Sequence, residues 1–218
     1  MARHDSLDLP TLQLVRFAAV VAQGEGSELG ERVPPLLEAQ VPVAWVEEML
    51  LQSVLMVGYP RALIALGVWR KVAGIPAPAS DPGADYRNAA EWTRRGQETC
   101  ATVYGDSYQN LRENIRALHP ALDAWMITEG YGRTLSRPGL DLLRRELCTV
   151  AQMAVLEAPR QLHSHLCGAL NAGAGFDQID AVLSEVNPLI SWHQWKRVKE
   201  LWSGVRERWA REQQGDSA

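Results

Sequence analysis

Apolar residues recur at helical spacing through most of this chain. From Leu140 to Ala154 they return every three or four positions, and a second stripe of this kind runs through residues 191–213. No segment alternates apolar and polar residues for long enough to predict a strand. Further helices are expected at residues 10–22, 35–40, 44–56, 61–72, 85–102, 108–118, 120–129 and 161–171, and after Asp177. The pattern therefore predicts an all-α fold.

Glycine and proline divide this pattern into three regions. Residues 23–34 are polar and glycine-rich, Gly58-Tyr59-Pro60 interrupts an apolar stretch, and residues 75–83 form a proline-rich linker. Another helix is expected to start near Arg137-Pro138, because proline suits the first helical turn. Residues 1–9 and those after Gln213 are expected to be poorly ordered tails.

The first and last regions resemble each other weakly. Residues 10–16 align with residues 138–144 at an offset of 128, with four of seven positions identical. This alignment predicts that residues 1–75 are a degenerate first helical repeat and that residues 130–218 are the second, joined by the linker and connecting helices of residues 76–129. In this register Ala18 stands opposite Glu146.

Tryptophan recurs every seven residues near the C-terminus, at Trp195, Trp202 and Trp209. Val198 and Val205 fall between them, so one face of the predicted helix is apolar. Such a face has to pack against something. Packing within the chain and a subunit interface are equally compatible with this pattern.

Composition excludes several classes of partner. The net charge is −4, which gives no reason to expect nucleic-acid binding. The longest apolar run, Leu12 to Ala22, contains Arg16 and is too short to cross a membrane, so we expect a cytoplasmic protein without a membrane partner. Three cysteines without a close pair are typical of a reducing compartment rather than of a disulfide framework.

Two polar residues are candidates for chemistry. Glu146 lies in an apolar helix and His165 lies in the next one, and short connections favour antiparallel packing that would bring the two together. A carboxylate beside an imidazole can act as an acid–base unit, or it can be a buried hydrogen bond that merely satisfies two polar groups. His163 and His165 diverge on a helix, so no metal site is expected.

The second half of the chain resembles a known superfamily. Arg145-Glu146, followed by residues 165–173 (His-Leu-Cys-Gly-Ala-Leu-Asn-Ala-Gly), is similar to the carboxymuconolactone decarboxylase and alkylhydroperoxidase-D superfamily. Its peroxidase branch has two cysteines between the glutamate and the histidine, and Ala158 and Gln161 occupy those positions here. The resemblance is therefore to the decarboxylase branch.

This resemblance implies an alkylhydroperoxidase-D-like helical fold and a lyase that removes CO₂ from a small carboxylated lactone or related acid without a cofactor. Glu146 and His165 would be the catalytic pair. Arg145, and less surely Arg144, would hold a substrate carboxylate, and Tyr131 would close the pocket or pack in the core. Since single-repeat relatives form hexamers, a duplicated chain is expected to form a homotrimer.

Two other functions are compatible with the sequence. Cys148 or Cys167 could replace the missing cysteine pair in a thiol-dependent redox protein related to the peroxidases. Alternatively, the chain could be a non-catalytic helical oligomer of the same fold, because one scaffold hosts several activities.

Overall fold

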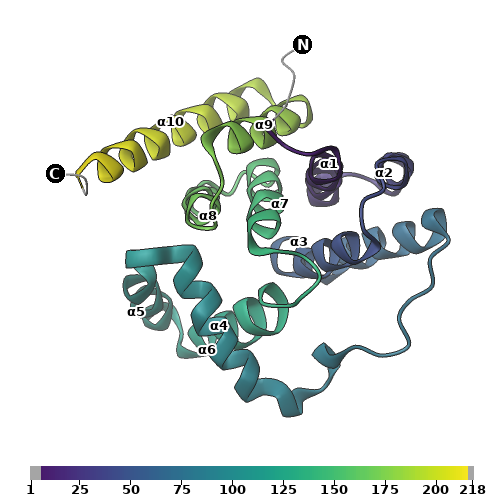
Figure 1. Cartoon of the computed structure of the whole chain (residues 1–218), viewed down its shortest axis with the longest axis horizontal. Helices are drawn as coiled ribbons and strands as arrows, with labels where there is room; N and C mark the ends of the chain where they lie inside the picture. Colours follow the sequence, from purple (N-terminus) through teal and green to yellow (C-terminus); the bar gives the residue numbers. More distant parts are fainter. Residues whose placement is uncertain (1–5, 216–218) are drawn as a thin grey trace.

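The computed structural model describes residues 6–215, which form helices and contain no strand (Figure 1). The α-helices are α1 (Leu9–Gln23), α2 (Gly26–Glu38), α3 (Val43–Ala73), α4 (Ala89–Tyr104), α5 (Tyr108–Leu118), α6 (Pro120–Trp125), α7 (Leu142–Val155), α8 (Pro159–Asn171), α9 (Phe176–Val186) and α10 (Trp192–Gly215). Short 3₁₀ turns are η1 (Pro82–Ala84), η2 (Tyr86–Asn88), η3 (Gly105–Ser107) and η5 (Asn187–Leu189), and η4 (Met126–Leu135) is π-helical. The predicted all-α fold class is confirmed.

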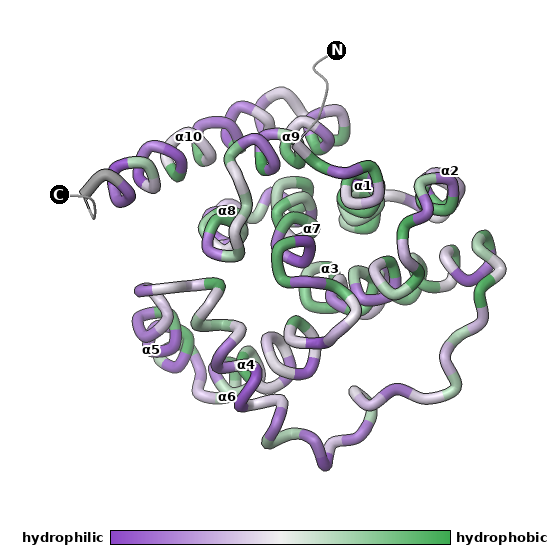
Figure 2. Tube along the Cα trace, viewed as in Figure 1, coloured by the Kyte–Doolittle hydropathy of each residue, from purple (hydrophilic) through white to green (hydrophobic). Residues whose placement is uncertain are grey.

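The two most buried helices, α1 and α7, pack against each other (Figure 2). Most positions of α1 from Thr11 to Ala22 are buried, as is every position of α7 from Arg145 to Val155. The buried run of α7 also includes polar residues, Arg145, Glu146, Thr149 and Gln152. α2 and α3 cover α1, while α8 and α9 cover α7.

Two predicted helix boundaries are wrong. Residues 26–34 were expected to be a loop, yet they belong to α2. The Glu28 carboxylate accepts the Glu25 backbone N–H at 2.8 Å and so caps the helix, and Leu29, Val33 and Leu36 form its buried stripe. These signals outweigh the glycines and prolines in this segment.

α7 also begins later than predicted. Gly139 has a φ of 100°, which ends any helix started at Pro138, and Asp141 then caps α7 by accepting the Arg144 backbone N–H at 3.0 Å. Asp8 caps α1 in the same way through Thr11, so the expected N-terminal tail is shorter than nine residues. The remaining tail residues, 1–5 and 216–218, lie outside the described residues.

Helices α1, α2 and α3 begin 133 residues before α7, α8 and α9 respectively. The caps match at the same spacing: Gln40 and Gly173 both have positive φ values, and their helices end in equivalent backbone hydrogen bonds. The predicted offset of 128 is therefore not the structural register, and Gln13 rather than Ala18 stands opposite Glu146. That a duplication produced this spacing stays a prediction.

The C-terminal helix α10 packs within the chain. Val198, Trp202 and Val205 are buried against α8 and α9, and the Trp202 ring lies edge-on to Phe176 with centroids 5.8 Å apart. The Trp202 indole N–H donates to Asp180 at 2.6 Å. The tryptophan stripe was compatible with packing within the chain or with a subunit interface. For Trp202, its central residue, packing within the chain accounts for the burial.

Helix α3 is long and apolar enough, by length and composition alone, to cross a membrane. Gly58, with φ 71° and ψ 170°, breaks it into two segments at the predicted interruption. The first segment buries Val46, Met49 and Leu50 in the core, and 33% of the most apolar window is buried within the protein.

Helix α4 and η4 touch through their backbones. A Cβ atom added to Gly96 would lie 2.1 Å from the Ile127 carbonyl oxygen, and one added to Gly132 would lie 2.0 Å from the Trp92 carbonyl oxygen. Real Cβ atoms do not approach that closely, so only glycine fits at these two positions. This contact fixes α4 against the segment that carries Tyr131.

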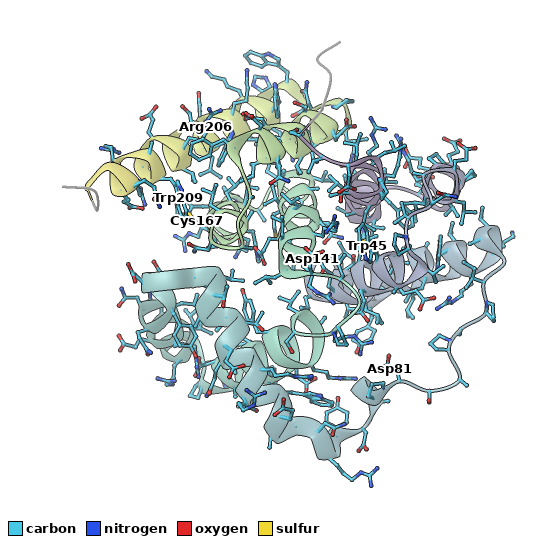
Figure 3. All side chains as sticks on the ribbon, viewed as in Figure 1. Trp45, Asp81, Asp141, Cys167, Arg206 and Trp209 are labelled. Atoms are coloured by element: carbon cyan, nitrogen blue, oxygen red, sulfur yellow. The ribbon has the colours of Figure 1, made fainter. Side chains whose placement is uncertain are left out.

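A buried ionic cluster joins α3, α7 and the linker. The Glu48 carboxylate accepts from Arg145 at 2.8 Å and from Arg137 at 2.9 Å, and Arg137 also donates to Asp81 at 2.7 Å. Arg145 is fully buried and donates further to Gln52 at 3.2 Å. Figure 3 shows Asp81 on the long connection between α3 and α4, which the cluster ties to the helical core.

We expect Gly132→Ala to destabilise the protein, since the added methyl group would force α4 and η4 apart. The loss should be about 1–3 kcal/mol, the usual penalty for overpacking, and it should appear as a lower Tm in calorimetry. Gly204→Ala is the matched control, because Gly204 lies in α10 with open space around it and alanine favours a helix. Equal Tm values for the two variants would contradict the close contact.

Removing Glu48 should be more damaging. Glu48→Leu would leave the buried Arg145 guanidinium without a carboxylate, which is expected to lower the free energy of unfolding by about 3–5 kcal/mol in urea denaturation. Glu98→Gln, which breaks an exposed pair with Arg94, should leave unfolding nearly unchanged. A Glu48 variant as stable as the Glu98 variant would show that the cluster does not hold the fold.

Candidate active site around Glu146 and His165

Glu146 and His165 meet in the interior, as their positions on successive antiparallel helices predict. Oε2 of Glu146, on α7, lies 2.8 Å from Nδ1 of His165, on α8. Glu146 is fully buried and the His165 side chain is 9% exposed. An ionised carboxylate can only accept, so Nδ1 carries the hydrogen and Nε2 is the ring nitrogen left for a ligand.

The second carboxylate oxygen of Glu146 has no partner. Oε1 is buried and makes no hydrogen bond with the described residues. Most buried polar atoms are hydrogen-bonded, and an unpaired one lowers stability by about 1–3 kcal/mol. Such an atom next to an acid–base pair is typical of a site shaped for chemistry rather than for stability.

A glycine on α8 allows the pair to come together. A Cβ atom on Gly168 would lie 2.5 Å from Glu146 Oε2 and 2.7 Å from the Val103 side chain. Any larger residue would therefore push the carboxylate away from His165. The contact also places α4 against the site, through Val103.

Two tyrosines lie beside the glutamate. The rings of Tyr131, on η4, and Tyr104, on α4, pack edge to face with centroids 6.2 Å apart. Burial raises the pKa of Tyr131 well above its usual value, and Tyr104 and the charge of Glu146 raise it further. Burial likewise raises the pKa of Tyr104. Both phenols therefore stay protonated near neutral pH and can donate hydrogen bonds, but they cannot serve as bases.

The predicted arginines face away from this pair. Arg145 is fully buried, and its guanidinium is directed to Glu48 and Gln52 on α3. Arg144 donates to Thr11 and Asp8 at the start of α1, and its guanidinium carbon lies 4.1 Å from the centroid of the Trp45 ring. Both are engaged in packing helices together, so in this structure neither is available to hold a substrate carboxylate beside His165.

The site contains residues that the sequence did not single out. Cys100 and Val103 on α4 belong to the small cluster that holds Tyr131, and Tyr104 packs against the same cluster. Nothing in their periodicity marks them, because they reach the site through tertiary packing of α4 on η4 and α8.

The cysteines are poorly suited to redox chemistry. Burial raises the pKa of Cys100 and of Cys148 to about 12, and it also raises the pKa of the partly buried Cys167. All three are free thiols. A reactive cysteine needs a lowered pKa and access to solvent. Among the described residues, no three histidine, cysteine, aspartate or glutamate side chains gather as a metal site.

Parts of this chain are similar to known proteins. "Peroxisomal protein 2" from Schizosaccharomyces pombe (strain 972 / ATCC 24843) is 27% identical over 158 residues, which span 72% of this chain and 71% of that protein. The family model described as the carboxymuconolactone decarboxylase family matches residues 120–202, the segment that supplies Tyr131, Glu146 and His165. Over this segment, the chain is similar to the carboxymuconolactone decarboxylase family.

Proposed function

We propose that this protein is a lyase that removes CO₂ from a small carboxylated lactone or related acid, with Glu146 and His165 as its acid–base pair. The observation that carries the proposal is the buried 2.8 Å contact between Glu146 Oε2 and His165 Nδ1. The similarity of residues 120–202 to the carboxymuconolactone decarboxylase family supports the same chemistry.

The proposed reaction needs an electron sink in the substrate. When the bond between the carboxylate carbon and its neighbour breaks, CO₂ leaves and the electron pair passes into a conjugated carbonyl as a dienolate. Nε2–H of protonated His165 then delivers a proton to carbon, and the ring takes up another proton from water. Glu146 stabilises the imidazolium and keeps its orientation.

Tyr131 has a supporting role in this proposal. Its phenol stays protonated beside Glu146, so it can donate a hydrogen bond to the dienolate oxygen as charge develops there. The predicted trimer and the cytoplasmic location stay predictions. If the protein turns over no acid, the alternative is a non-catalytic helical oligomer of the same fold.

The central test is ultraviolet-monitored turnover of γ-carboxymuconolactone. His165→Ala and Glu146→Gln should each lower kcat by about 100-fold or more, because positioned proton transfer contributes that much. His163→Ala is the matched control. His163 lies on the same helix as His165, but the charged group that acts on it is Arg208 of α10 rather than Glu146. A His165 variant as active as the His163 variant would contradict the assignment.

The thiols test the redox alternative. Because burial raises the pKa of Cys100 and Cys148 to about 12, they should react with iodoacetamide at neutral pH far more slowly than free cysteine. Cys167, the least buried of the three, should be modified first, as followed by mass spectrometry. Rapid peroxide consumption with loss of Cys148 or Cys167 thiol would instead favour a peroxidase-related function.

A further inference from the structure

The part of α3 that follows the kink at Gly58 is the counterpart of α10. Tyr59 directly follows the kink, and it lies 133 residues before Trp192, the first residue of α10. The three earlier helix pairs begin at the same spacing. Trp69 and Trp202 are equivalent at this spacing, and both are buried. Each half of the chain therefore contains four helical segments in the same order.

Each half also has a cavity at the same place. The first, of about 350 Å³, lies where the end of α1, the start of α2 and the second part of α3 meet. The other, of about 250 Å³, lies where the end of α7, the start of α8 and α10 meet (Figure 1). All seven residues that line the first cavity have counterparts 133 residues later that line the second. A hollow that recurs in this way is a feature of the helix arrangement rather than a local packing defect.

The two cavities have different walls. The first is lined in part by two glycines and two charged side chains, namely Gly24, Gly26, Glu25 and Arg61. The second, which we call the α10 cavity, has a largely apolar wall that includes Met153, Ala154, Leu162, Val198 and Leu201. The second half therefore combines the repeated hollow with a surface suited to an apolar ligand.

The polar groups at the α10 cavity already have partners. Glu157 and Arg197 form an ion pair with each other. The side-chain amide of Gln194 donates to the backbone carbonyls of Ala154 and Val155 at 2.7 Å and 3.0 Å, at the end of α7. A charged ligand would have to displace the Glu157–Arg197 pair or lose its hydration without gaining a partner. The cavity therefore favours a neutral ligand.

We propose that the α10 cavity binds a small neutral molecule built of one aromatic ring and a short alkyl group. An apolar cavity of about 150 Å³ holds benzene, so the larger volume here leaves room for the alkyl group as well. Met153 supplies a thioether, which packs favourably against aromatic rings. This ligand lacks the carboxylate that the proposed lyase removes, and neither Glu146 nor His165 lines the cavity. The inference is therefore independent of the proposed function.

Nuclear magnetic resonance of protein labelled with ¹³C at its methionine methyl groups tests the inference, with ethylbenzene as the probe. Ethylbenzene should shift the Met153 methyl signal in a saturable manner, because its ring would lie against that methyl group. The signal of Met49, which lies in the main core, should not move. 3-Phenylpropionate has the same ring and a two-carbon chain but adds a carboxylate, so it should bind at least about tenfold more weakly.

Ala158→Leu narrows the α10 cavity and should weaken ethylbenzene binding by about tenfold or more, since the ring would lose its contacts with the wall. Gly26→Leu is the matched control, because it makes a change of similar size at the first cavity, where Gly26 has open space around it. It should bind ethylbenzene as the wild type does. If Ala158→Leu lowers the Tm, Leu201→Trp fills the same cavity from the α10 side.

Three results would overturn the inference. One is a Met153 signal that does not saturate with ethylbenzene, and another is equal affinity for ethylbenzene and 3-phenylpropionate. The third is unchanged ethylbenzene binding by a variant that fills the α10 cavity and keeps the Tm of the wild type. Loss of binding in Gly26→Leu alone would likewise contradict the assignment to the α10 cavity.

Discussion

Glu48 is the carboxylate on which the arrangement of this molecule depends. It lies buried on α3 and accepts from Arg145 of α7 and from Arg137, which in turn holds Asp81 of the linker. Three segments that are far apart in the sequence are thus fixed by one anion. Because Arg145 is fully buried, its charge is tolerated only with this partner. The start of α7, and with it the position of Glu146, follows from this cluster.

Arg145 and Glu146 are neighbours in the sequence but have opposite environments. A helical step of about 100° directs Arg145 to α3 and Glu146 to α8. Arg145 and Glu146 both belong to the family-like motif. Arg145 stabilises the fold, whereas Glu146 belongs to the candidate site.

Periodicity predicted the long helices and the meeting of Glu146 with His165, because both follow from local spacing and short connections. It missed residues 26–34 of α2, where a capping glutamate and a stripe of three buried residues outweigh glycine and proline. It also misplaced the repeat, since identity over seven residues is weaker evidence than the shared spacing of three helix starts. Cys100 and Val103 were not predicted, because only the tertiary packing of α4 on η4 and α8 brings them to the site.

Aligning the two halves of the chain by their helix starts shows that the residues at equivalent positions differ in acid–base chemistry. At a spacing of 133 residues, Gln13 and Arg32 stand where Glu146 and His165 stand in the second half. Neither an amide nor a guanidinium can move a proton near neutral pH, since neither group titrates there. The equivalent of Thr149 is Arg16, which forms an ion pair with Glu185 at 2.6 Å and so joins α1 to α9. The first half therefore contributes packing for α7 and α9, and the proton chemistry that we propose is confined to the second half.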